Sequence, residues 1–109
     1  MSLVIEKIAG ELGIPLRSQG ALRLIRRCDC DNFVEACKSA KLLILGIEAF
    51  RIIQGRPIPD TDFIADFSDL ASEPWELAYV EAARSAAIYF GKASAHADLW
   101  FDFSLREVP

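Results

Sequence analysis

Two apolar runs separated by glycine and proline constrain the fold of this chain more than any other feature. The first run is Leu42–Ile53, the second covers residues 62–68, and Gly55, Pro57 and Pro59 lie between them. Short apolar runs bounded by glycine and proline are typical of neighbouring β-strands. We therefore predict that these two segments pair in one sheet.

The second run and the last segment of the chain both alternate between apolar and polar residues. In residues 62–68 one side carries Phe63, Ala65 and Phe67, and the other carries Asp62, Asp66 and Ser68. In residues 99–107 one side carries Leu99, Phe101, Phe103 and Leu105, and the other carries Trp100, Asp102, Ser104 and Arg106. Alternation of this kind predicts strands with one buried and one solvated side. We expect these two phenylalanine-lined strands to lie side by side beneath a helix.

Three segments have apolar residues at helical spacing: 3–12, 32–41 and 73–92. Asp29 or Asp31 is the predicted N-cap of the second helix, and Ser72 that of the third. In the third segment Trp75, Tyr79, Ala82, Ala86 and Phe90 form one stripe, which suits close packing on a sheet.

Residues 21–27 fit either a strand or a helix, because seven residues do not separate the two periodicities. We favour a strand, since a new helix start follows. The whole chain of 109 residues then forms a single α+β domain, a two-layer sandwich. After an N-terminal helix, its elements follow the β-α-β-β-α-β order of the ferredoxin-like plan. An antiparallel sheet of three to four strands would carry its helices on one face.

In this arrangement the face of the sheet away from the helices is acidic. We expect it to display Glu48, Asp62, Asp66, Trp100, Asp102 and Ser104. Such a surface can bind Mg²⁺ or Ca²⁺, act as an acid/base pair, or attract a basic protein. An ordinary solvated sheet face carries equal weight. Trp100 among carboxylates has the composition of an interaction hot spot, unless Phe50, Ile64 and the N-terminal segment cover it.

Composition limits which classes of binding partner and which cellular compartment we expect for this protein. Twelve basic and sixteen acidic side chains leave a net charge of −4, which argues against a nucleic-acid partner. We recognise neither a membrane span nor an export signal, and three cysteines fit a reducing cytoplasm better than a disulfide framework. The cysteines and the lone His96 lack zinc-ligand spacing, so no cofactor is expected. Arg23, Arg26 and Arg27 form a small basic cluster that we interpret as a solvated edge.

Three segments resemble a known family: LGIEAF at residues 45–50, PDTDFIADFSD at 59–69 and FDFSL at 101–105. In their order, with an alanine-rich helix before the last, they are similar to small bacterial immunity proteins of polymorphic or contact-dependent toxin systems. The resemblance covers about the C-terminal two-thirds of the chain. It implies a cytoplasmic, non-enzymatic antidote that neutralises a cognate toxin by binding it.

The leading hypothesis joins the resemblance to the acidic face. An immunity protein would cover the active site of its toxin and, if that toxin is a nuclease, match its phosphate-binding cations. One alternative is a metal-dependent enzyme that uses Glu48, Asp62 and Asp66. Another is a small dimeric ligand-sensing module, and the sequence leaves monomer and homodimer open.

Overall fold

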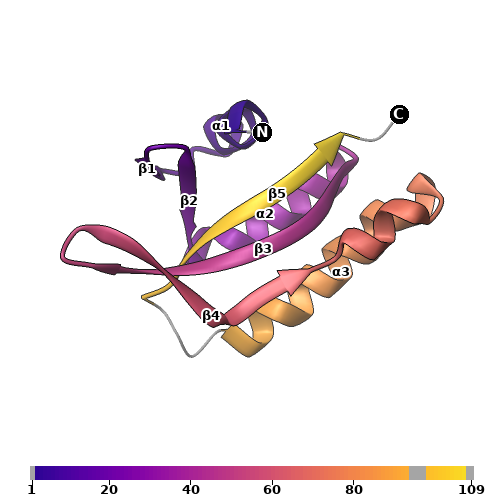
Figure 1. Cartoon of the computed structure of the whole chain (residues 1–109). Helices are drawn as coiled ribbons and strands as arrows, with labels where there is room; N and C mark the ends of the chain where they lie inside the picture. The colour runs from indigo at the N-terminus through magenta and orange to yellow at the C-terminus, as the bar shows by residue number, and fades with distance from the viewer. Residues whose placement is uncertain (1, 94–97, 108–109) are drawn as a thin grey trace.

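The computed structural model describes residues 2–93 and 98–107 and has an α+β architecture (Figure 1). Its elements in chain order are α1 (Ser2–Leu12), β1 (Leu16–Gln19), β2 (Leu22–Arg26), α2 (Arg27–Ser39), β3 (Leu42–Ile53), β4 (Arg56–Asp66), the 3₁₀ helix η1 (Ser68–Ser72), α3 (Trp75–Ala93) and β5 (Trp100–Glu107). Within these residues no helix is both long enough and apolar enough to cross a membrane.

The strands form one antiparallel sheet in the order β1-β2-β5-β3-β4. The prediction of three to four strands is therefore wrong, because β1 adds a fifth strand at one edge. β1 and β2 are joined by Gly20 and Ala21, and Gly20 has a φ of +58°, which favours glycine. A two-residue connection with glycine is a hairpin signal, but the two strands are too short to stand out by periodicity.

From β2 onward the chain order is β-α-β-β-α-β, but β1 lies between this series and the N-terminal helix, so the expected ferredoxin-like order is not confirmed. Each helical connection joins two parallel strands that have one other strand between them: β5 separates β2 from β3, and β3 separates β4 from β5. The phenylalanine-lined strands β4 and β5 are thus not neighbours, contrary to the expectation. The ferredoxin-like arrangement stays a prediction, because of the additional strand at the β2 edge.

The core lies between the sheet and the helices α2 and α3, which pack against each other; in Figure 1 α2 lies behind β3 and β5, and α3 lies beside β4. Phe33 of α2 and Phe90 of α3 contact Phe103 of β5, with ring centres 4.7 and 5.8 Å apart. Ala82 and Ala86 are fully buried, so α3 approaches the sheet closely, as the alanine stripe predicts. Helix α1 adds Ile5 and Ile8 to the same core.

Several predicted element boundaries are wrong. Helix α2 begins at Arg27, and Asp29 accepts hydrogen bonds from the Arg26 side chain instead of capping the helix. Ser72 belongs to η1, and α3 starts after Pro74, whose carbonyl accepts the first helical hydrogen bonds.

Strand β4 begins at Arg56, six residues before the predicted start. It includes Pro57 and Pro59, which an edge strand tolerates because one of its sides has no hydrogen-bonded neighbour. The turn before it consists of Gln54 and Gly55, with φ values of +52° and +77°. Two residues in this conformation match the right-handed twist of a hairpin.

Candidate functional site

The outer face of the sheet, on the side away from α2 and α3, brings together four of the six predicted site residues. Glu48 of β3 lies directly opposite Asp102 of β5. Gly46, two residues earlier on the same side of β3, lies opposite Ser104 on one neighbouring strand and Asp66 on the other. Glu48, Asp66 and Ser104 are exposed, so this part of the predicted acidic face is open to a partner.

Gly46 produces a gap in the middle of this face. It has no side chain between those of Asp66 and Ser104, and a Cβ atom added to it would lie 3.1 Å from the carbonyl oxygen of Ala65. That distance is shorter than most Cβ contacts in proteins. The oxygen belongs to the backbone, so it has little freedom to move away. The three carboxylates therefore lie near a position that has no side chain.

Asp62 is set apart from the other carboxylates. Glu48 lies opposite Ile64 and Ala49 lies opposite Asp60, so residues 61–63 form a bulge that shifts the register between β3 and β4. Asp62 is exposed in this bulge, and its backbone N–H donates a 3.1 Å hydrogen bond to Asp60. The alternation of residues 62–68 could not reveal a bulge, and Ile64, 52% exposed, occupies the place beside Glu48.

The carboxylates of the outer face differ in their electrostatic environment. Burial, and secondarily the negative charge of Glu48, raises the pKa of Asp102 from its ordinary value of 3.8 to about 6. Hydrogen bonds from Ser68 lower the pKa of Asp66, and one of them is a 2.9 Å bond from the Ser68 backbone N–H. Asp66 is therefore a firmly ionised member of the face, whereas Asp102 titrates close to neutral pH.

Replacing Asp102 with asparagine is expected to stabilise the protein above about pH 6, because this carboxylate is ionised there in an unfavourable site. A raised pKa means that the folded state binds the proton more tightly than the unfolded state. The stability of the native sequence should therefore fall as pH rises from about 4 to about 6 and then level off. Urea unfolding of both proteins across this pH range measures the difference.

Asp66→Asn is the matched control for this prediction. Because the pKa of Asp66 is lowered by folding, its ionised form is the stabilising one, and the substitution should reduce stability at neutral pH. An Asp102→Asn protein that is less stable than the native sequence at pH 7 and equal to it at pH 5 would contradict the assignment.

Trp100 is only partly exposed. It lies opposite Phe50, and Leu24 of β2 is on the same side of the sheet. Phe50 and Leu24 are both buried. The guanidinium carbon of Arg17 lies 5.8 Å from the centre of the Trp100 ring. β1 therefore covers part of the indole, as the alternative interpretation proposed, and Trp100 belongs to a small apolar cluster at the end of the outer face.

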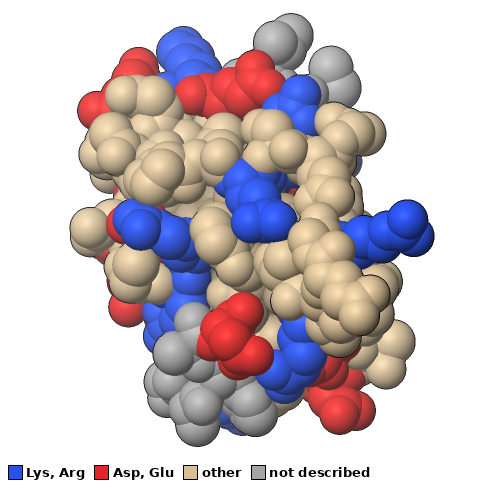
Figure 2. All heavy atoms as spheres, turned by 90° about the vertical axis from the view of Figure 1, so that its left-hand side faces the viewer, with Lys and Arg blue, Asp and Glu red and all other residues tan. Residues whose placement is uncertain are grey.

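Figure 2 views the end of the molecule that is formed by β1, β2 and the β3–β4 turn. Lys and Arg side chains are spread over this end, with Asp and Glu side chains between them and near its margins. The arginines of the predicted basic cluster each have a carboxylate nearby: Arg23 is 2.6 Å from Glu6, Arg26 is 2.9 Å from Asp29 and Arg27 is 3.6 Å from Asp31. Arg26 is exposed, as the interpretation of a solvated edge requires, whereas Arg23 and Arg27 are half-buried, so the interpretation is wrong for these two.

Metal binding is not supported by the side chains that the structure places. Within residues 2–93 and 98–107, no three His, Cys, Asp or Glu side chains are positioned to share a metal ion, so Glu48, Asp62 and Asp66 do not form the proposed ligand set. Cys30 and Cys37 are buried in the core, and burial raises the pKa of both thiols. His96 lies outside the described residues.

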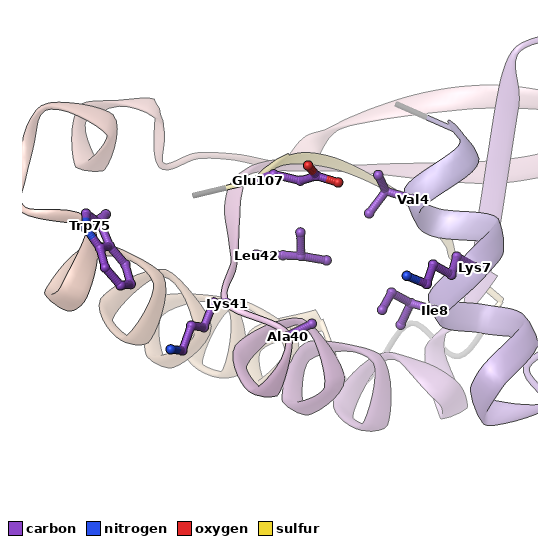
Figure 3. Close-up of a pocket in the computed structure, with 8 residues that line it drawn as sticks. All are labelled: Val4, Lys7, Ile8, Ala40, Lys41, Leu42, Trp75 and Glu107. Carbon is purple, nitrogen blue, oxygen red and sulfur yellow. The ribbon is translucent and has the colours of Figure 1, made fainter. Parts of the chain in front are cut away.

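A groove of about 370 Å³ at the opposite end of the molecule was not predicted (Figure 3). Helix α1 and Trp75 at the start of α3 lie on opposite sides of it, and the turn between α2 and β3 forms its floor. Lys41 in that turn has a φ of +58°, and its Nζ atom lies 5.8 Å from the centre of the Trp75 ring. The residues come from four distant parts of the chain, so no local motif indicates this groove. The groove is lined by apolar residues together with Lys7, Lys41 and Glu107. Because charges of both signs are present, the lining does not favour one class of ligand.

Comparisons of the chain with protein-family models, curated proteins and solved structures find no match.

Proposed function

We propose that this protein is a binding protein that docks a basic protein partner on the outer face of its sheet. The observation that carries the proposal is the placement of Glu48, Asp66 and Asp102 around the gap at Gly46 on one side of three adjacent strands. An open sheet face with several carboxylates favours a cationic surface and disfavours phosphate backbones.

The proposed partner is a toxin, and the protein is its cytoplasmic, non-enzymatic antidote. The three segments that resemble immunity proteins fall on β3, on β4 with the start of η1, and on β5. These are the three strands that form the acidic face, so the resemblance and the geometry concern the same surface. A protein bound there would have its cationic residues covered, and a nuclease would then lose access to nucleic-acid phosphates.

Association with the partner should be fast and salt-sensitive, because complementary charge accelerates encounter. The test uses the partner captured from native cells with the tagged chain and then purified. Glu48→Gln/Asp66→Asn removes two exposed charges from the face and leaves the half-buried Asp102 in place. We expect association with this variant to be about tenfold slower at low salt, with a weaker dependence on salt concentration.

Glu11→Gln/Glu35→Gln is the matched control, because it removes the same charge from exposed positions on α1 and α2. Its association rate should stay within about threefold of that of the native sequence. Equal slowing in the two variants would show that net charge and not this face governs binding. Neutralisation is tested separately, by the growth of cells that express the captured partner with or without this chain.

A further inference from the structure

The outer side of α3, opposite its alanine stripe, carries a row of residues that the acidic face does not use. At about 100° per residue, the row falls within an arc of about 60° on the helix surface. Its members are the exposed Leu77, Arg84 and Ile88 and the half-exposed Glu81. Leu77 is 65% exposed and Ile88 is 52% exposed, which is unusual for large apolar side chains of one helix.

We propose that this row is a self-association surface and that its partner is a second copy of the same chain. The order of residue types along the row is apolar, acidic, basic, apolar. When two such helices lie antiparallel about a two-fold axis between residues 82 and 83, Leu77 of each copy faces Ile88 of the other, and Glu81 of each copy faces Arg84 of the other. Each pair occurs twice.

Charge complementarity favours this arrangement over the others. In a parallel pairing in register, Glu81 would face Glu81 and Arg84 would face Arg84. The antiparallel pairing has no like-charge contact along the row, and it closes the assembly as a two-fold dimer. Within one chain Arg84 already contacts Glu81 at 2.6 Å, so the two copies would share a network of four charges.

Apolar surface beside the row extends the contact. Val80, 40% exposed, lies on one flank of Leu77. On the other flank Ile88 lines a groove of about 440 Å³ between α3 and the edge strand β4, together with Phe67 and Tyr89. Figure 1 shows α3 at the margin of the molecule, and the exposure of Leu77 and Ile88 leaves this side accessible to a second copy.

The size of the surface indicates a weak and reversible dimer. One helix pair with a narrow flank covers less than the roughly 800 Å² per partner of a standard stable interface. We therefore expect a dissociation constant of about 10⁻⁵ to 10⁻⁴ M, in which the apolar pairs supply most of the affinity and the charges supply orientation. The acidic face lies on the other side of the sheet, so dimerisation and partner binding are independent.

The experiment is sedimentation velocity of the purified chain between about 5 µM and about 1 mM, a range that brackets the expected dissociation constant. The weight-average mass should rise with concentration from that of one chain towards that of two. Ile88→Asp places a carboxylate against Leu77 of the other copy and should leave only monomer. Ile53→Asp is the matched control, because Ile53 is 51% exposed at the β3–β4 turn, and this variant should associate like the native sequence.

A charge-exchange pair tests whether positions 81 and 84 lie at the contact between the two copies. Glu81→Arg gives one copy two adjacent cations, and Arg84→Glu gives another copy two adjacent anions, so each variant alone should dimerise at least about tenfold more weakly. An equimolar mixture should recover association as a heterodimer, because every charge then faces its opposite. A native chain that stays monomeric at the highest concentration, or a mixture that associates no better than its components, would overturn the proposal.

Discussion

Phe90→Ala is expected to remove about 3–5 kcal/mol from the free energy of unfolding, the usual cost of deleting a fully buried phenylalanine side chain. Phe90 has no exposed surface, and its ring meets Phe101 edge-on at 5.0 Å. It also holds the end of α3 against α2, because Arg27 lies over the ring and donates a 2.9 Å hydrogen bond to the Phe90 carbonyl. A cavity at this position removes contacts with the sheet and with α2 together.

Urea unfolding followed by circular dichroism measures this loss. Ile58→Ala serves as the control, since Ile58 is a large apolar residue on β4 that is 44% exposed, and its replacement should cost less than about 1 kcal/mol. Similar losses for the two substitutions would mean that α3 does not dock on the sheet through Phe90.

Ala86→Leu should destabilise the protein by about 2–3 kcal/mol, because a larger side chain has no room between α3 and the sheet. Ala86 is fully buried on the helix face that also carries Ala78 and Ala82. The close approach of this helix depends on these small side chains, so the added atoms must push the helix away or force strained rotamers.

The next residue provides an internal control for this prediction. Ala87 is exposed, and Ala87→Leu should change the free energy of unfolding by no more than about 0.5 kcal/mol. The midpoint of thermal unfolding of the two variants gives the comparison directly. If Ala87→Leu were the more damaging change, the orientation of α3 about its axis would be wrong.

Local patterns in the sequence were sufficient for most of the secondary structure. Alternation identified the last strand to within one residue at its start, because its apolar side is buried along most of its length. The strand interpretation of residues 21–27 is confirmed by β2, and the α+β class follows from the order of the elements. In each case the periodicity of burial is a property of neighbouring residues.

Elements without such periodicity were missed or shortened. β1 has four residues of mixed character, so nothing in its pattern distinguishes it from a loop. The first half of β4 contains two prolines, which normally end a strand but are tolerated at the edge of this sheet. Whether a strand lies at an edge depends on the order of the strands, which is set by contacts between distant segments.

For the candidate site too, local alternation predicted part of the arrangement, and contacts between distant segments decided the rest. Alternation correctly placed Glu48, Asp66, Asp102 and Ser104 on one side of their strands, because side chains of a strand point alternately to its two faces. The position of Asp62 was wrong because a bulge changes the phase of β4, and Trp100 was partly covered because β1 folds beside it.

The residue pattern thus specified which side chains turn outward, since that depends only on the local backbone. The folded chain decided which of them meet, because β3 comes to lie between β4 and β5 and places Glu48 opposite Asp102. The raised pKa of Asp102 and the alignment of the α3 row with open solvent are consequences of that packing, which involves residues far apart in the chain.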